Sequence, residues 1–279
     1  MRNLIALLSL LCLTAPPASA EAPRGDGVQV GEASSLRKLV PAEQLERSAA
    51  QQYLQMKQQA ADNRALAPDN HPQLIRLRAI AKRILPFAPR FNPAASRWRW
   101  EVNLIGSKQL NAFCMPGGKI AFYTGLVEGL KLTDDEIAVV MGHEIAHALR
   151  EHARERIAKT QLTHGAAAIA SELLSGTKYG GLAQLGLRGG ANLLTLKFSR
   201  EDESEADLVG LDMSARAGFD PRAGISLWQK MSAASKGAPP QWLSTHPAGT
   251  NRIAEIERHL PEVMPLYQAA RAAAPNPKP

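Results

Sequence analysis

The sequence of 279 residues contains few cysteines, only Cys12 and Cys114. Two cysteines exclude a disulfide-rich scaffold and a zinc site made of four cysteines. Disorder over the whole chain is excluded as well, because 45% of the residues are apolar, an ordinary fraction for a globular protein. The length suffices for one large domain or two small ones.

Long apolar runs are missing beyond the N-terminus. No segment after residue 20 has 18 uncharged apolar residues, so we predict no membrane span and expect the mature protein to be soluble. The N-terminus has a positive start, the apolar stretch Leu4–Leu13 and the small residues Ala18-Ser19-Ala20, which is the order of a secretory signal peptide. We therefore predict a signal peptide over residues 1–20 and export of the chain; a buried N-terminal helix is the alternative.

Basic residues outnumber acidic ones by 33 to 26, which gives a formal net charge of +7. Such a surplus permits a nucleic acid or an anionic membrane surface as partner. We predict no nucleic-acid partner, because export removes the usual target and the basic residues are scattered among acids. Peripheral contact with a membrane stays possible, and the sequence indicates no oligomeric state.

Apolar periodicity, helix caps and β-favouring runs divide the chain into elements. We expect one folded domain over residues 36–262, a flexible leader over 21–35 and a disordered tail over 263–279. The expected helices cover residues 41–61, 73–85, 133–158, 199–217, 221–234 and 251–260, the expected strands 98–105, 111–115 and 120–124, and a loop 237–250. Residues 165–196 are rich in Gly, Ala and Leu; we expect one or two closely packed helices there, with a membrane-touching hairpin as the alternative.

The pentapeptide HEIAH at residues 143–147 matches the pattern H-E-x-x-H. On a helix, His143 and His147 share one face, so their ring nitrogens can bind one metal ion. Glu144 points to the side of that pair, where it can take a proton from metal-bound water. The alternative is a helix with two surface histidines and a glutamate.

Zinc with an open catalytic position needs a third protein ligand. The acidic helix expected over 199–217 offers two pairs of acids with helical spacing, Glu203 with Asp207 and Glu201 with Glu205. Within the first pair, Glu203 could bind zinc while Asp207 orients a histidine. A solvated helix face is the alternative for any single acid. Two histidines and one glutamate suit one zinc ion per chain.

These motifs together resemble the gluzincin metallopeptidases of the HtpX and CAAX-prenyl-protease kind, in particular the soluble periplasmic members of Gram-negative bacteria. The resemblance covers about residues 36–262 and rests on four segments: HEIAH at 143–147, SREDESEAD at 199–207, NAF with PGG at 111–118, and STHP with RI at 244–253. We expect the protein to lack the spanning helices of the membrane-bound members and the C-terminal helical repeats of one periplasmic branch.

The resemblance implies an α+β, mostly helical fold: a zincin-like catalytic domain with a small β-sheet and an active-site helix that carries H-E-x-x-H. It implies a zinc endopeptidase with Glu203 as the third ligand and Asp207 beside the site. It also implies an edge strand near residues 110–115. We expect substrate to add to this strand through main-chain hydrogen bonds, at Asn111, Ala112, Phe113 and Cys114.

The expected function is zinc-dependent hydrolysis of peptide bonds in misfolded or unassembled cell-envelope proteins in the periplasm. Zinc-bound water would attack, with Glu144 as general base. The alternative is a chaperone or assembly factor that binds envelope clients at the same edge strand and cleaves rarely.

Five further residues carry weaker predictions. His246 could stabilise the oxyanion or close over the zinc as a fourth ligand that keeps the enzyme latent, and the alternative is a loop histidine bonded to backbone. Arg252 could pair with an active-site carboxylate or brace the acidic helix. His152 and His164 lie off the face of the metal histidines, so we expect surface or packing roles. Cys114 is expected to be buried beside the sheet, with pairing to another molecule as the alternative.

Overall fold

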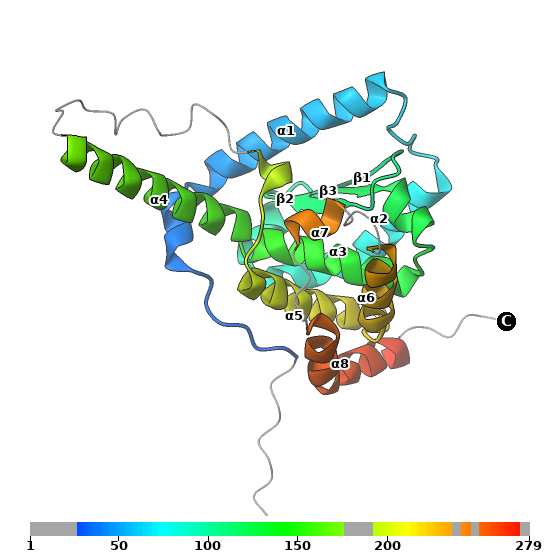
Figure 1. Ribbon diagram of the computed structural model, residues 1–279. Coiled ribbons are helices and arrows are strands. Elements are labelled where there is room, and N and C mark those ends of the chain that lie inside the picture. The colour runs from blue at the N-terminus through cyan, green and yellow to red at the C-terminus, as the bar shows by residue number, and fades with distance from the viewer. Residues whose placement is uncertain (1–26, 176–191, 236–240, 247–250, 274–279) are drawn as a thin grey trace, which may run out of the picture.

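A computed structural model of the chain (Figure 1) describes residues 27–175, 192–235, 241–246 and 251–273. In the first of these ranges, the side chains are described up to residue 163. The expected signal peptide lies outside these residues. Helices dominate, and the strands form one small sheet, so the predicted α+β, mostly helical fold is confirmed. Within the described ranges, no helix is long and apolar enough to cross a bilayer.

The sheet has three strands in the order β1-β3-β2, namely β1 (Glu101–Ile105), β3 (Lys119–Tyr123) and β2 (Ala112–Met115). Strand β3 runs parallel to β1 and antiparallel to β2, so within the described residues β2 pairs along one edge only. A tight turn joins β2 to β3 through Gly117 and Gly118, both with φ of +81°. A Cβ on Gly118 would lie 2.7 Å from the ring of Trp100. Both its positive φ and the lack of space therefore require glycine at this position.

Helices cover both faces of the sheet (Figure 1). Helix α1 (Ala42–Asp62) lies on one face, where the Tyr53 hydroxyl donates a hydrogen bond to the carbonyl of Ile120 at 2.5 Å. Helices α2 (Pro72–Ile84) and α3 (Asp134–Leu149) pack on the other face. Successive residues of β2 alternate between the two sides: Ala112 packs with the α2–α3 core and Phe113 with the α1 side.

Behind α3, a second layer of helices packs away from the sheet. It consists of α5 (Arg200–Arg216), α6 (Ala223–Ala234) and α8 (Arg252–Ala273), with α5 between α3 and α8. The shorter elements are η1 (Ser35–Leu39), η2 (Leu85–Arg90), η3 (Pro93–Arg97), η4 (Gly125–Gly129), η5 (Leu193–Thr195) and α7 (Gln241–Thr245).

Two glycines let α3 and α5 approach closely. A Cβ on Gly142 would lie 2.6 Å from the carbonyl oxygen of Gly210, and a Cβ on Gly210 would lie 2.6 Å from the backbone nitrogen of His143. Both obstacles are backbone atoms, which cannot rotate away. The contact therefore fixes the distance between the helix that carries HEIAH and the helix that carries the acids.

Replacing Gly210 by alanine should lower the free energy of unfolding by about 1–3 kcal/mol, because overpacking outweighs the helix propensity gained. The midpoint of urea denaturation measures this. Gly129→Ala is the control, since its Cβ would meet only a Leu110 methyl group at 3.5 Å, an ordinary contact. Equal stability of the two variants would contradict a backbone-limited contact.

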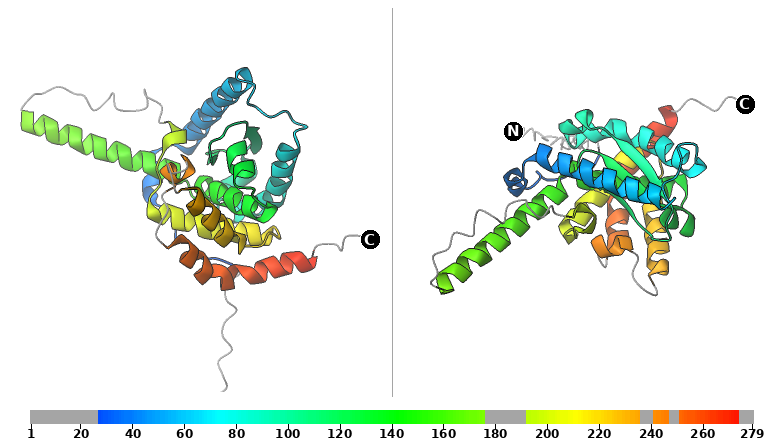
Figure 2. Two further views of the ribbon diagram at one scale, coloured as in Figure 1. Left: turned by 45° about the vertical axis from the view of Figure 1, so that its right-hand side comes forward. Right: turned by 90° about the horizontal axis from the view of Figure 1, so that it is seen from above.

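The start of α3 agrees with the sequence, but its end does not. Thr133 and Glu136 form the predicted capping box. The single helix expected over 133–158 is instead two, because α3 ends at Leu149 and α4 (His152–Ser175) begins after a turn at Glu151, whose φ is +59°. The Glu151 carboxylate binds Arg154 at 2.6 Å and Arg37 at 2.8 Å, which holds the turn. Helix α4 then extends away from the rest of the described chain (Figure 2).

Three other segments differ from expectation. Part of the expected flexible leader packs on the domain, since Val28 is buried and its N–H donates to Asp212 at 3.0 Å. The C-terminal half of α8 occupies residues 263–273, where the sequence indicated a tail. Helix α7 interrupts the loop expected over 237–250. Of the Gly/Ala/Leu-rich segment 165–196, residues 165–175 continue α4, and residues 176–191 lie outside the described part.

Candidate metal centre

His143 and His147 occupy successive turns of α3 and point their Nε2 atoms at each other, 3.0 Å apart. Both side chains are buried, as is every residue of α3 from Glu136 to Leu149. Two imidazole nitrogens this close leave little room for anything but a shared proton or a shared ion. This supports the metal-binding interpretation over a pair of surface histidines.

Glu203, on the first turn of α5, adds its carboxylate to the pair. Its oxygens lie 3.4 Å from His147 Nε2 and 3.5 Å from His143 Nε2. A capping box between Ser199 and Asp202 fixes the start of α5. The contact between Gly142 and Gly210 fixes the distance of α5 from α3. Burial raises the pKa of Glu203, but hydrogen bonds with His147 and His246 outweigh it and hold the pKa well below its usual range.

His246, directly after α7, completes a group of four donors. Its Nδ1 lies 3.0 Å from Glu203 and 3.3 Å from His143 Nε2, and the four ligand atoms lie within 4.8 Å of one another. Burial lowers the pKa of His246, but the carboxylates of Glu144 and Glu203 outweigh it and raise the pKa. Burial holds the pKa of His147 well below its usual value. Imidazole nitrogens and a carboxylate are the donors that zinc takes in proteins, so these residues fit a zinc ion.

Asp207 and Arg252 hold this group from the α5–α8 side. Asp207 Oδ1 lies 2.9 Å from His143 Nδ1, which orients the ring so that Nε2 faces the other donors. Arg252 donates to Glu203 Oε2 at 2.6 Å and to Asp207 Oδ1 at 2.5 Å, and its guanidinium lies 4.2 Å from the ring centroid of Trp228. Arg252 thus contacts both acids and braces the acidic helix, which combines the two roles predicted for it.

Glu144 lies beside the donor group and not in it. The indole N–H of Trp242, from α7, donates to Glu144 Oε1 at 2.6 Å, and His246 Nε2 lies 3.6 Å from the same oxygen. The backbone N–H of Trp242 also donates to the carbonyl of Leu110 just before β2, at 3.1 Å. Sequence reasoning missed Trp242, because a helix of one turn has no periodic pattern to reveal it.

The model of peptidase family M48 matches residues 74–260. The chain belongs to peptidase family M48. Over 199 residues it is 35% identical to the mitochondrial metalloendopeptidase OMA1 of Schizosaccharomyces pombe, an alignment that covers 71% of this chain and 56% of that protein. Its four buried donors are typical of zinc in M48 peptidases.

The alignments with two other relatives cover less of this chain. Human OMA1, a mitochondrial metalloendopeptidase, is 32% identical over 186 residues, 63% of this chain and 35% of that protein. The β-barrel assembly-enhancing protease of Escherichia coli is 30% identical over 172 residues, 58% of this chain and 35% of that protein. The chain thus spans between about a third and just over half of the length of these three relatives.

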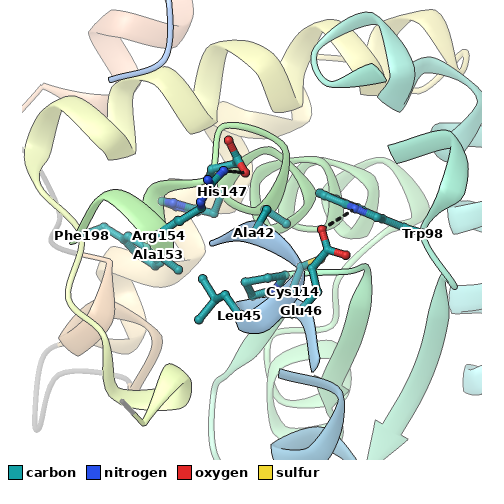
Figure 3. A pocket seen from close by; sticks show the side chains of 12 residues that line it. Ala42, Leu45, Glu46, Trp98, Cys114, His147, Ala153, Arg154 and Phe198 are labelled. Atoms are coloured by element: carbon teal, nitrogen blue, oxygen red, sulfur yellow. Dashed lines mark hydrogen bonds and ion pairs between the residues drawn. The ribbon is translucent and has the colours of Figure 1, made fainter. Parts of the chain in front are cut away.

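In this M48 chain a groove runs from strand β2 to the donor group. A cavity of about 40 Å³ is lined by residues 111–116 and by Glu144, His147 and His246. The four residues predicted to bind substrate, Asn111, Ala112, Phe113 and Cys114, all line it. The adjoining cavity of about 20 Å³ is bordered by Leu45, Trp98, Cys114, His147 and Phe198 (Figure 3). The partly buried Cys114 therefore borders the groove rather than the interior of the core.

His152, for which the sequence predicts a surface or packing role, has a buried side chain, which agrees with packing. Its contact with His147 is new, since the Nδ1 atoms of the two rings lie 2.9 Å apart. Helical spacing placed it off the metal face, yet the break between α3 and α4 turns it back toward that face. The side chain of His164, given the same assignment, lies outside the described part.

Proposed function

We propose that the chain is a zinc-dependent endopeptidase, with one zinc ion per chain, that hydrolyses peptide bonds in misfolded or unassembled proteins of the cell envelope. The observation that carries this proposal is a buried carboxylate, Glu144, directly beside four convergent metal donors. Membership of family M48 and the metalloendopeptidases among its relatives support the activity.

His143, His147 and Glu203 would hold the zinc ion, and Glu144 would move the proton. Zinc held there supplies a Lewis acid that makes water acidic and polarises a carbonyl. Glu144 accepts the proton of the attacking water and later delivers it to the leaving amine. Trp242 fixes one oxygen of Glu144, which keeps the carboxylate facing the donor group. Asp207 and Arg252 keep the ligands oriented.

His246 is the residue that must move before cleavage. A catalytic zinc site has three protein ligands and one open position, whereas four protein ligands close a site. His246 Nδ1 lies among the other three donors. We propose that a zinc site closed in this way by His246 is a latent state. Withdrawal of His246 opens the fourth position, and its ring is then free to stabilise the oxyanion.

The edge of β2 supports extended substrates. One edge of this strand is paired with β3, so its other edge offers N–H and C=O groups to a polypeptide along the groove. Main-chain hydrogen bonds select an extended backbone over particular side chains, and unfolded or unassembled proteins provide such backbones.

The proposed compartment and the branch of the family are based on the sequence. The signal-like N-terminus supports export to the periplasm of a Gram-negative bacterium, and the motifs support the HtpX and CAAX-prenyl-protease branch. Proteins of the envelope are the proposed partners, with peripheral membrane contact and without nucleic acid. A relative named as a β-barrel assembly-enhancing protease also favours a second candidate, a client-binding assembly factor that uses the same edge strand and cleaves rarely.

Removal of the metal tests the proposal. Metal analysis should find about one zinc per chain, and a chelator should abolish cleavage of casein, since the remaining groups cannot polarise the carbonyl. Zinc added back should restore cleavage, and chelator saturated with zinc beforehand should have no effect. Cleavage by the metal-free chain would exclude the proposed chemistry, whereas zinc binding with casein binding but no cleavage would favour the assembly factor.

A further inference from the structure

We infer that His152 and Glu205 form a positioning pair that sets the hydrogen-bond direction, and thereby the metal-binding atom, of His147. The pair lies behind His147, on the side away from the other donors. His152 Nδ1 lies 2.9 Å from His147 Nδ1, and His152 Nε2 lies 2.7 Å from Glu205 Oε2. The inference rests on the proposed metal site, not on cleavage.

The direction of this chain of hydrogen bonds follows from its acidic end. An ionised carboxylate only accepts, so His152 must donate from Nε2 to Glu205. When His152 is neutral it has one donor and one acceptor nitrogen, so its Nδ1 then accepts. His147 therefore donates from Nδ1, which leaves the lone pair of its Nε2 free, and Nε2 is the atom that faces the donor group.

His143 reaches the same tautomer by a shorter route, through direct contact of its Nδ1 with Asp207. The two metal histidines thus each have an acid behind them, one in direct contact and one through a second imidazole. One acid from each of the two pairs on α5 takes part: Asp207 orients His143, and Glu205 orients His147 through His152. Glu201, in contrast, is exposed.

Arg150 fixes the orientation of Glu205. Its Nη2 lies 2.7 Å from Glu205 Oε1, and the other oxygen is left for His152. Arginine only donates. If glutamine replaced Glu205, its amide oxygen would turn toward Arg150 and its NH₂ group toward His152. That NH₂ group would donate to His152 Nε2. The hydrogen bond between His152 and His147 would then reverse as well, which would place the proton of His147 on Nε2.

The test measures zinc affinity by competition with a chromogenic chelator, without any substrate. Glu205→Gln and His152→Leu should each weaken zinc binding by about 10–100-fold, the usual range for partners of a ligating histidine. His152→Gln should recover a large part of the loss, because its amide oxygen can accept from His147 and its NH₂ group can donate to Glu205. Glu201→Gln, on the same helix, is the matched control and should bind zinc like the wild type. The absorption spectrum of bound Co²⁺ should change in Glu205→Gln and His152→Leu only.

Several results would overturn the inference. Zinc affinity within about threefold of the wild type in Glu205→Gln or in His152→Leu would exclude a positioning role. So would a loss in His152→Gln as large as that in His152→Leu, since packing alone would then explain both. If the metal-free Glu205→Gln and His152→Leu variants lost as much free energy of unfolding as they lost in zinc binding, this would likewise indicate a structural role only. If the wild type itself bound no zinc, the proposed function would fail; if it bound zinc and the variants did too, only this inference would fail.

Discussion

Replacing Glu144 by glutamine is expected to leave zinc bound and to lower casein cleavage by about 10²–10⁴-fold. The carboxylate lies beside the metal donors and is not one of them, so the ligand set is unchanged. A neutral amide cannot accept the proton of water, and general base catalysis accounts for a factor of that size. Trp242 can still donate to the amide oxygen, so the side chain should keep its place.

The measurements are zinc content and the initial rate of casein cleavage, with Glu201→Gln again as the control. The control should cleave like the wild type, because Glu201 is exposed. Cleavage by Glu144→Gln within about threefold of the wild type would refute the role of Glu144 as the base. The same variant separates the two candidate functions: a client-binding assembly factor would keep its client-protecting effect in Glu144→Gln, whereas an endopeptidase would lose its effect.

The parts of the site that follow a helical period could be predicted from the sequence. His143 and His147 are four residues apart on one helix, and Glu203 and Asp207 repeat that spacing on another. The bounds of α5 match expectation to within one residue at each end, because Ser199 caps its start and Gly218 follows its end. The choice of Glu203 among four acids needed the resemblance to known metallopeptidases, since spacing alone left two pairs open.

The parts that the sequence missed depend on contacts between distant segments. Glu151 ends α3 without glycine or proline, and the turn is held by Arg37, over a hundred residues away in the chain. His152 therefore contacts His147 by a route that no helical period describes. Trp242 reaches Glu144 from a helix of five residues, too short for a periodic signal. Local pattern thus predicted the histidine pair and the acid pair Glu203 and Asp207, and it failed for His152 and Trp242, which are held in place by contacts between distant segments.

Replacing Arg252 by methionine is expected to lower the free energy of unfolding of the metal-free protein by about 3–5 kcal/mol. Arg252 is 5% exposed and bridges Glu203 and Asp207, so its removal leaves two buried carboxylates without their shared cation. Zinc would supply a positive charge to Glu203, so the loss should be smaller in the zinc-bound protein. Urea denaturation with and without zinc measures both values.

Arg258→Met is the control on the same helix, since the one ion pair of Arg258 among the described residues is an exposed pair with Glu255. Its effect should stay within about 0.5 kcal/mol. Arg252→Lys should be intermediate, because a single ammonium group keeps the charge but cannot reach both carboxylates in the planar geometry of arginine. If Arg252→Met lost no more stability than Arg258→Met, the two carboxylates would not depend on this cation. A loss that zinc leaves unchanged would mean that Arg252 stabilises the packing of α8 on α5 and not the charge of the metal ligands.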